Sequence, residues 1–241
     1  MISSTRSLSI ADARELQPGD DHYRAYVGPP DRYDLIATLQ LSVLFFLGLR
    51  DTDEVLDFGC GSLRLGRLLI PYLQPEGYFG IEPNAWLVDE GARRELGADA
   101  LALKRPRFDQ NDRFDCTVFG QRFDFIMAQS ILTHTGFAPA QALCRSFAQA
   151  LKPGGLAVVN WIVGEADDPA VHETDWLYPH CHTYGPDTVA HVYEQAGLAA
   201  RVTRWWHPGG ARWDVLALDE ASLPAQSEFD RIDFKPLHRL R

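Results

Sequence analysis

The amino-acid sequence predicts an α/β fold: a doubly wound, mostly parallel seven-stranded sheet with a C-terminal antiparallel hairpin. Apolar runs of strand length alternate with segments of helix length over residues 54–196, which is typical of parallel strands joined by helices. The first two runs end in an acidic residue, Asp57 and Glu82, one strand–helix–strand unit apart. A His-Pro-Gly-Gly turn at 207–210 separates the last two runs and indicates the hairpin.

The expected elements follow from this alternation. A first helix over 33–47 is started by Pro30 and Asp31, which favour a helix N-terminus. The expected strands are 54–58, 78–82, 100–104, 124–129, 156–163, 199–206 and 212–218. The expected helices between them are 63–73, 85–96, 138–150 and 187–196. Because the final pair of strands forms a hairpin, we expect a parallel sheet with one antiparallel edge.

The chain is expected to form one domain with two flanking segments. The parts are an N-terminal segment 1–50, a core 51–220 that includes an aromatic substrate loop 164–185, and a loosely packed tail 221–241. In the first part, Tyr23, Tyr26 and Tyr33 surround the Gly-Pro-Pro-Asp turn at 28–31. These half-polar rings predict either a lid that closes over a ligand or a clamp that packs the first helix on the sheet, and they favour the lid.

Composition and charge exclude several classes of protein. Hydrophobic residues make up 46% and charged residues 23% of the chain, as in a soluble globular protein. The formal net charge of −10 argues against nucleic acid as a partner, because broad contact with it requires a basic face. The longest apolar run, 39–49, is too short to span a bilayer, and no charged-then-apolar leader is visible. We therefore expect a cytoplasmic protein with no membrane partner.

Neither a disulfide nor a metal site is predicted. The four cysteines show no paired spacing, so we expect free thiols in a reducing compartment. The cluster His180, Cys181 and His182, with His172 or His207, offers ligand types that suit zinc. These residues crowd one loop without the spacing of a chelating pair, so we expect no metal.

The most informative segment is the turn at 57–66, where an apolar strand breaks sharply into a helix. Gly59 and Gly61 let the turn take unusual dihedral angles and let a ligand approach the backbone. A dinucleotide fingerprint needs a third glycine three residues after Gly61, but Arg64 stands there and the next glycine is Gly66. The pattern therefore favours a ligand with a cationic end, which the carboxylate of Asp57 can meet, over a pyrophosphate.

This Asp-x-Gly-x-Gly turn resembles motif I of the class I S-adenosylmethionine-dependent methyltransferases, although that family carries one more small residue where this chain has Leu63. The strand 124–129 and the stretch 130–134 behind it resemble motif IV of the same family. The Leu-Lys-Pro-Gly-Gly turn at 151–155 is also similar to a turn common in that family. The resemblance covers residues 54–163 and implies a Rossmann-like fold with S-adenosylmethionine as the cofactor.

The resemblance also implies which residues contact the cofactor. The candidates for holding its methionine part are Asp57, Gly59, Cys60 and Gly61. Glu82 is expected to accept hydrogen bonds from both ribose hydroxyls. Arg64 either pairs with the cofactor's carboxylate or lies at the surface, and Asn84 either caps the next helix or touches the ligand. The remaining candidates are Asp115 and Cys116 for the adenine pocket and Gln129 behind the fourth strand.

Histidines and aromatic residues gather in the segments expected on the acceptor side. For methyl transfer the protein mainly positions the nucleophile for an in-line displacement, and a base matters where the acceptor is a hydroxyl or a protonated amine. Histidine is the natural base near neutral pH. His134 is the first candidate for its position, with His180 and His182 as alternates. The candidate acceptor residues, some of which could instead pack the loops, are Tyr26, Trp176, Tyr178, Tyr184, Trp206 and His207.

The sequence therefore predicts a methyltransferase acting on a small molecule or a saccharide, most simply at oxygen, as a monomer or homodimer. The saccharide hypothesis rests on the aromatic rings and histidines around the expected site. Two alternatives stay open. One is a nicotinamide-dependent oxidoreductase, which the displaced third glycine disfavours, and the other is a non-catalytic S-adenosylmethionine-binding subunit. Methylation of a protein acceptor is open as well.

Overall fold

A single sheet organises residues 5–231, the part of the chain that the computed structural model describes. The strand order is β3-β2-β1-β4-β5-β8-β7, and a short strand, β6, pairs with β5 beside this path. The strands are β1 Val55–Phe58, β2 Tyr78–Ile81, β3 Arg107–Asp109, β4 Phe123–Ala128, β5 Leu151–Val163, β6 Thr183–Tyr184, β7 Ala199–Val202 and β8 Arg212–Ala217. The pairs of β8 with β5 and β7 are antiparallel and the others are parallel, so the predicted fold class is confirmed.

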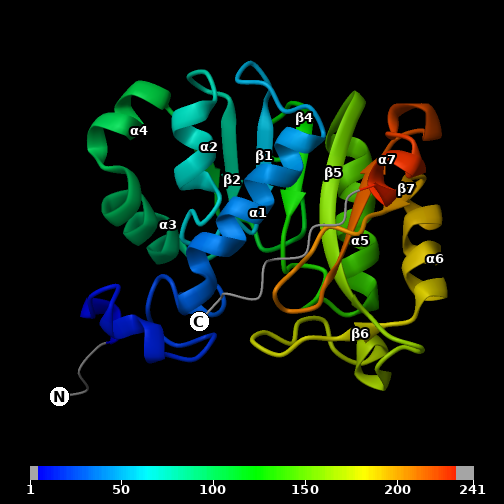
Figure 1. Ribbon diagram of the computed structural model, residues 1–241, viewed down its shortest axis with the longest axis horizontal. Coiled ribbons are helices and arrows are strands. Elements are labelled where there is room, and N and C mark those ends of the chain that lie inside the picture. The colour runs from blue at the N-terminus through cyan, green and yellow to red at the C-terminus, as the bar shows by residue number, and fades with distance from the viewer. Residues whose placement is uncertain (1–4, 232–241) are drawn as a thin grey trace.

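Helices cover both faces of the sheet (Figure 1). They are α1 Tyr33–Phe46, α2 Gly66–Tyr72, α3 Ala85–Gly91 with a π-helical turn Ala92–Leu96, α4 Ala98–Lys104, α5 Phe137–Ala150, α6 Pro186–Ala196 and α7 Gln226–Asp230. On one face, α5 and α6 bury Phe147 and Val192 against strand residues such as Val159. On the other, α1 and α2 bury Leu44 and Leu69 against the opposite side of the same strands.

Several expected boundaries are wrong, and two of them have a local reason. The segment expected as a strand over 100–104 is helix α4, because its alternating alanines and leucines are strong helix formers. The third strand comes later, over Arg107–Asp109. Helix α2 begins at Gly66 rather than at Leu63, whose φ of +60° takes the backbone out of the helical region. The strand expected over 199–206 ends at Val202.

The Leu-Lys-Pro-Gly-Gly turn is built into the start of β5. Leu151 pairs with Phe123 and Leu156 pairs with Phe125, so the residues between them form a bulge on β5. Gly154 has a φ of +78°, a left-handed value that favours glycine. The turn therefore joins α5 directly to β5.

The described part of the C-terminal tail packs against the core, contrary to the expected loose tail. Phe229 on α7 is fully buried, and its ring lies 5.8 Å from that of Phe46 on α1. Large apolar side chains hold short helices in place because their burial is favourable, by roughly 1.5–3 kcal/mol each. Residues 232–241 of the expected tail lie outside the described residues.

No helix within residues 5–231 is both long enough and apolar enough to cross a membrane. All four cysteines lie in this described part and are free, with three of them buried and Cys181 exposed. Among the same residues, no group of three or more histidine, cysteine or acidic side chains could hold a metal ion.

Candidate active site

The glycine turn follows β1 and is tied to the end of the neighbouring strand. Gly59 and Gly61 adopt φ values of +72° and +54°, and so both take the left-handed conformation that glycine tolerates. The N–H groups of Gly59 and Cys60 donate to the carbonyl of Ile81 at 2.8 and 3.0 Å. The N–H of Gly61 donates to Oε2 of Glu82 at 3.1 Å. The turn and the acidic end of β2 therefore form one rigid unit.

Asp57 lies in β1 immediately before this turn and is 3% exposed. The Tyr78 hydroxyl donates to its Oδ2 at 2.8 Å. Burial raises the pKa of Asp57 to about 7; the Tyr78 hydrogen bond and Arg64 oppose this rise, and Glu82 adds to it. Gly66 makes the arrangement possible, since a Cβ there would lie 2.6 Å from the Tyr78 hydroxyl oxygen. The displaced glycine thus serves the packing of Tyr78 against α2.

Glu82 lies just past β2 and is held from two sides. Its Oε1 accepts hydrogen bonds from the backbone N–H and side-chain amide of Asn84 at 2.9 and 2.8 Å, while Oε2 accepts from Gly61. Asn84 makes no side-chain cap to α3, so it orients Glu82 instead of capping the helix. Burial raises the pKa of Glu82, opposed by these hydrogen bonds. Oε2 accepts only one of these hydrogen bonds, so it has a second lone pair that can accept from a ligand.

Arg64 is 8% exposed and points across the turn, so the expected alternative of a surface arginine is wrong. Its Nη1 donates to the carbonyl of Val27 at 2.7 Å, and its Nη2 donates to Oε1 of Gln129. Its buried Nε has no partner among the described residues. Burial lowers the pKa of Arg64. A buried guanidinium whose hydrogen bonds all go to neutral groups is suited to pair with an anion.

The candidate adenine-side residues lie near the end of β3. The carbonyl of Asp109 accepts from the N–H of Glu82 at 3.0 Å, and Asn111 bonds both the Asp109 side chain and the carbonyl of Asp115. These contacts bring Asp115 to the edge of the Glu82 region. Cys116 is fully buried in the core cluster, and its N–H donates to the Ser146 hydroxyl.

His134 follows β4 and has a defined tautomer. Its Nδ1 lies 2.6 Å from the carbonyl oxygen of His180, so Nδ1 carries the proton and donates. Nε2 is then the ring nitrogen with a free lone pair. Burial lowers the pKa of His134, so the ring is neutral at neutral pH. This is the form that a general base requires.

The two alternate histidines are placed differently. His180 is exposed and contributes its backbone carbonyl to His134. His182 is fully buried, and neither of its ring nitrogens has a partner among the described residues. The backbone N–H of His182 donates to the carbonyl of Thr133 at 2.8 Å. The structure therefore brings the imidazoles of His134 and His182, but not that of His180, into the buried region behind β4.

Backbone hydrogen bonds attach the aromatic loop to the segment behind β4. The N–H of Gly136 donates to the carbonyl of Asp175, and the N–H of Leu177 donates to that of His134, both at 2.9 Å. Thr135 and Trp176 form an isolated antiparallel bridge. The loop and His134 therefore form one structural unit, an arrangement that no motif in the sequence indicates.

Aromatic rings from several segments meet beside His134. The Tyr178 ring lies 5.0 Å from that of His134 and 5.5 Å from that of Tyr26. Trp176 stacks on Tyr178 at 6.3 Å and remains 45% exposed. The Tyr178 hydroxyl is buried without a partner among the described residues. Tyr26 also contacts Trp86 on α3 at 5.3 Å. Trp176 and Tyr178 thus present a partly open aromatic surface.

The remaining candidates divide between packing and the site. Tyr184 is fully buried, packs on Trp161 at 4.8 Å and donates to the carbonyl of Thr135, which is a packing role. His207 lies 3.3 Å from the side chain of Gln129, and burial, with Arg64 and Arg32, lowers its pKa to about 4. Trp206 is partly exposed in the segment between β7 and β8.

Two apolar residues that the sequence did not single out press on the turn. A Cβ on Gly59 would lie 2.1 Å from Cδ1 of Ile131, and one on Gly61 would lie 2.6 Å from Cγ1 of Val27. The cavity bounded by Asp57, the turn, Arg64 and Gln129 has a volume of about 20 Å³. Val27 belongs to no recognisable motif and Ile131 lies in the stretch 130–134 that resembles motif IV, but only the folded chain brings them to the glycines.

Comparison with known proteins assigns the chain to a family. Residues 31–201, more than half of the chain, match a family described as a methyltransferase domain, and the chain belongs to this family. No curated protein sequence matches it.

Solved methyltransferase structures share the fold at low sequence identity. An S-adenosylmethionine-dependent methyltransferase from Clostridium acetobutylicum ATCC 824 has a TM-score of 0.57 and 13% identity, over 77% of this chain and 92% of that one. The glycopeptide N-methyltransferase MtfA complexed with S-adenosylmethionine has a TM-score of 0.58 and 16% sequence identity, over 76% of this chain and 94% of that one. Magnesium protoporphyrin IX methyltransferase from Synechocystis PCC 6803 with bound S-adenosylmethionine has a TM-score of 0.52 and 16% sequence identity, over 77% of this chain and 82% of that one.

The fold and the family together define a class I methyltransferase. The methyltransferase structures that share the fold include complexes with S-adenosylmethionine, the cofactor that the sequence predicts. The predicted family and enzyme class are confirmed.

Proposed function

We propose that the enzyme transfers the methyl group of S-adenosylmethionine to an oxygen of a small-molecule acceptor, and that this acceptor is a saccharide. The hydrogen bond from Nδ1 of His134 to the carbonyl of His180 carries the proposal, because it leaves Nε2 as a neutral base beside an aromatic surface. A hydroxyl acceptor requires such a base, whereas a thiolate does not.

The turn residues fit the cofactor by charge. Asp57, whose carboxyl is buried, pairs with the α-ammonium group, and Arg64, whose Nε lacks a partner among the described residues, pairs with the α-carboxylate. Glu82, oriented by Asn84 and Gly61, accepts the ribose hydroxyls. The Gly59-Cys60-Gly61 backbone passes close to the methionine part, and Gln129 orients Arg64. The adenine lies toward Asp115 and the backbone of Cys116.

The acceptor lies on the aromatic side. When bound, S-adenosylmethionine supplies a methyl group already activated on a sulfonium. Trp176 offers an exposed ring face on which a sugar ring can stack, and the unpartnered Tyr178 hydroxyl can bond a polar substituent. His134 takes the proton of the attacking hydroxyl at Nε2. Tyr26 completes the same wall from the N-terminal segment, which we propose acts as a lid that controls entry to the site.

Two steps test the proposal. Calorimetric titration with S-adenosylmethionine, S-adenosylhomocysteine and NAD is expected to show binding of the first two, lost in Asp57→Ala. A panel of sugars, phenols, amines and peptides with radiolabelled cofactor is then expected to label a sugar. Label on an amine or peptide alone contradicts the saccharide assignment. Cofactor binding without labelling of any acceptor supports a non-catalytic subunit, and binding of NAD in place of S-adenosylmethionine contradicts the cofactor site.

A further inference from the structure

The segment 23–28 lies directly on the glycine turn. The side chain of Val27 packs so closely on Gly61 that a Cβ there would lie 2.6 Å from Cγ1 of Val27. The carbonyl of Val27 accepts from Nη1 of Arg64 at 2.7 Å. The cavity that remains, about 20 Å³, has room for about one water molecule. In this arrangement the segment occupies the space that a ligand at Gly61 needs.

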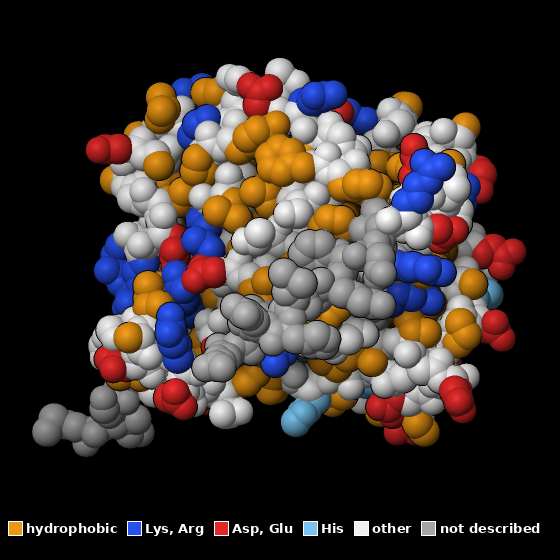
Figure 2. Space-filling model, viewed as in Figure 1, with side chains coloured by type: hydrophobic (Ala, Val, Ile, Leu, Met, Phe, Trp, Pro, Cys, Tyr) orange, Lys and Arg blue, Asp and Glu red, His pale blue; other side chains and the backbone are white. Residues whose placement is uncertain are grey.

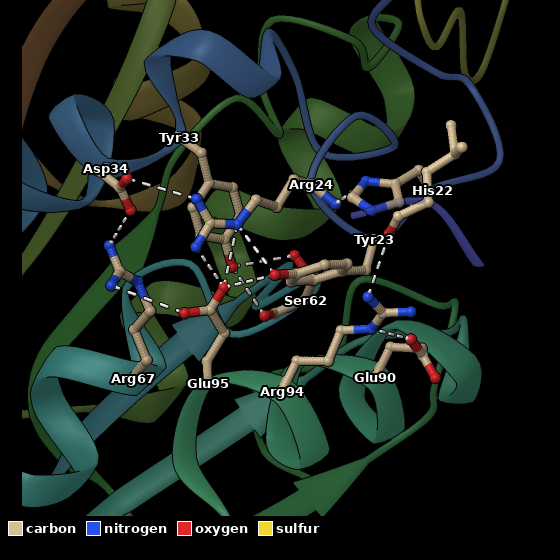
Figure 3. A network of polar contacts seen from close by, with 11 residues as sticks. His22, Tyr23, Arg24, Tyr33, Asp34, Ser62, Arg67, Glu90, Arg94 and Glu95 are labelled. Carbon is tan, nitrogen blue, oxygen red and sulfur yellow. Dashed lines mark hydrogen bonds and ion pairs between the residues drawn. The ribbon is translucent and has the colours of Figure 1, made fainter. Parts of the chain in front are cut away.

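One buried carboxylate holds this segment in place (Figure 3). Oε1 of Glu95, in the π-helical turn behind α3, accepts from the Tyr23 hydroxyl at 2.7 Å. The same oxygen accepts from Nε and Nη2 of Arg24 at 3.0 and 2.5 Å. The side chains of Glu95 and Arg24 are only 9% and 7% exposed. Removing one partner of such a buried pair strongly destabilises the arrangement in which the other partner is buried, because that charge is left uncompensated.

The contacts continue from Glu95 to the glycine turn. Asp34 on α1 pairs with Arg24 at 3.4 Å and with Arg67 at 2.6 Å. Both guanidinium groups lie over the Tyr33 ring, at 4.5 and 5.4 Å. The Tyr33 hydroxyl donates to the carbonyl of Ser62, directly behind Gly61, at 3.0 Å. Figure 2 shows basic side chains gathered at the seam between the N-terminal segment and the α3 region.

We infer that Glu95 is a positioning residue of the cofactor site. Its hydrogen bonds to Tyr23 and Arg24, here called the clasp, hold Val27 on Gly61. The cofactor enters when the clasp opens. The inference rests on the proposed cofactor site at Asp57 and Gly61. The Val27 side chain lies against Gly61, where the cofactor must approach the turn, so loading the site and closing the segment exclude each other at that glycine.

The direction of the effect follows from population shift. If the closed arrangement excludes the cofactor, the apparent dissociation constant is the intrinsic one divided by the fraction of open protein. Weakening the clasp raises that fraction, so association becomes faster and binding tighter. Dissociation of the cofactor, which starts from the open arrangement, keeps its rate. A clasp that instead closed over bound cofactor would give the opposite result, with faster dissociation and weaker binding.

Stopped-flow binding of S-adenosylhomocysteine, followed by tryptophan fluorescence, separates these cases. Glu95→Gln is expected to raise the association rate constant about fivefold or more, in the usual range of coupling between sites, with an unchanged dissociation rate. Val27→Ala, which leaves the clasp intact, is expected to raise the association rate as well. Glu76→Gln removes an exposed ion pair to Arg105 and serves as the matched control, with wild-type rates expected.

The outcomes divide cleanly. Unchanged association in both Glu95→Gln and Val27→Ala, or faster dissociation with weaker binding, overturns the inference. If Glu95→Gln does not fold, as judged by its thermal melting curve, Val27→Ala alone decides. Failure of the proposed site is a separate result, since Asp57→Ala would then bind S-adenosylhomocysteine as wild type does.

Discussion

The two halves of the candidate active site are built in different ways. The cofactor half comes from consecutive elements, because the glycine turn, Asp57 and Glu82 all lie within one β1–α2–β2 unit. The turn bonds Glu82 directly, and Tyr78 of β2 bonds Asp57. The acceptor half comes from distant parts of the chain, with Tyr26, His134 and Tyr178 brought together by loops. The cofactor half is therefore determined by local backbone geometry, and the acceptor half by tertiary assembly.

Burial favours the neutral form of the titratable groups in both halves, but the consequences differ. It raises the pKa of Asp57 and Glu82 and lowers that of His134 and His207, so it favours the neutral form of each. A neutral histidine is ready to accept a proton. A neutral carboxyl must first lose one before it can pair with an ammonium group. The cofactor half should therefore respond to its ligand by changing charge, whereas the acceptor half is already in its working state.

Removal of the base is expected to have the largest effect and to fall on the acceptor half alone. His134→Gln should lower kcat by about 10²–10⁴-fold, the usual contribution of a general base. The dissociation constant for S-adenosylmethionine should stay within about twofold, because no cofactor contact is lost. Steady-state kinetics with the acceptor identified by the panel, together with calorimetry, measures both quantities.

His180→Ala is the matched control for this prediction. The His180 ring is exposed, and its backbone carbonyl, which orients His134, is kept in the variant. Wild-type kcat is therefore expected. An equal loss in His180→Ala and His134→Gln would mean that the loop as a whole, and not the His134 base, carries the effect.

Glu82→Gln is expected to act on the cofactor half. The substitution keeps the shape of the side chain but weakens its hydrogen bonds, and bonds to a charged group contribute about 1.5–3 kcal/mol. Cofactor affinity should fall about 10–100-fold, while kcat at saturating cofactor changes little. Calorimetry and initial rates check this split, and a fall in kcat with unchanged affinity would contradict the ribose role.

Trp176→Ala is expected to have a smaller effect on the acceptor half. The exposed ring is a stacking surface, and loss of one such contact should raise the acceptor KM by roughly tenfold, with kcat and cofactor affinity close to wild type. Trp205→Phe provides a control, because Trp205 packs against Phe46 on the far side of the core from the loop. A drop in kcat with unchanged KM would place Trp176 in loop packing instead.

The geometry of the glycine turn and of the two acidic strand ends could be predicted because its signals are local. A strand that ends in Asp57, a turn that needs Gly59 and Gly61, and a second strand that ends near Glu82 are each readable within a few residues. The misplaced strand at 100–104 arose where local signals conflict, since a run of alternating alanine and leucine satisfies a strand pattern and a helix propensity together.

The acceptor half and the clasp could not be predicted in the same way. Glu95 resembles any acid on a helix, and nothing in its neighbourhood shows that Tyr23 and Arg24 will meet it from more than seventy residues away. The orientation of His134 depends on a backbone carbonyl, which has no sequence signature. Val27 and Ile131 are ordinary apolar residues until the fold places them on the glycines.

The smallest expected effect is a proton released from the cofactor half. The pKa of Asp57 is raised from 3.8 to about 7 in the folded protein, so the carboxyl is about 90% protonated at pH 6. Because the folded protein binds this proton more tightly than the unfolded chain, the contribution of Asp57 to the free energy of unfolding falls as pH rises from about 4 to 7. It does not change further above that range. A bound ammonium group favours the carboxylate, so binding of S-adenosylmethionine at pH 6 should release close to one proton, and affinity should weaken as pH falls below 7.

Calorimetry at pH 6 in buffers with different ionisation enthalpies counts the protons released, since the apparent binding enthalpy changes with buffer in proportion to their number. Asp57→Asn should abolish most of the release, while His134→Gln should leave it unchanged, because the histidine is already neutral and belongs to the other half. If the wild type releases no proton at pH 6, Asp57 does not ionise on binding, and the pairing of its carboxylate with the ammonium group is wrong. A release that persists in Asp57→Asn would instead assign the proton to Glu82, whose pKa burial also raises.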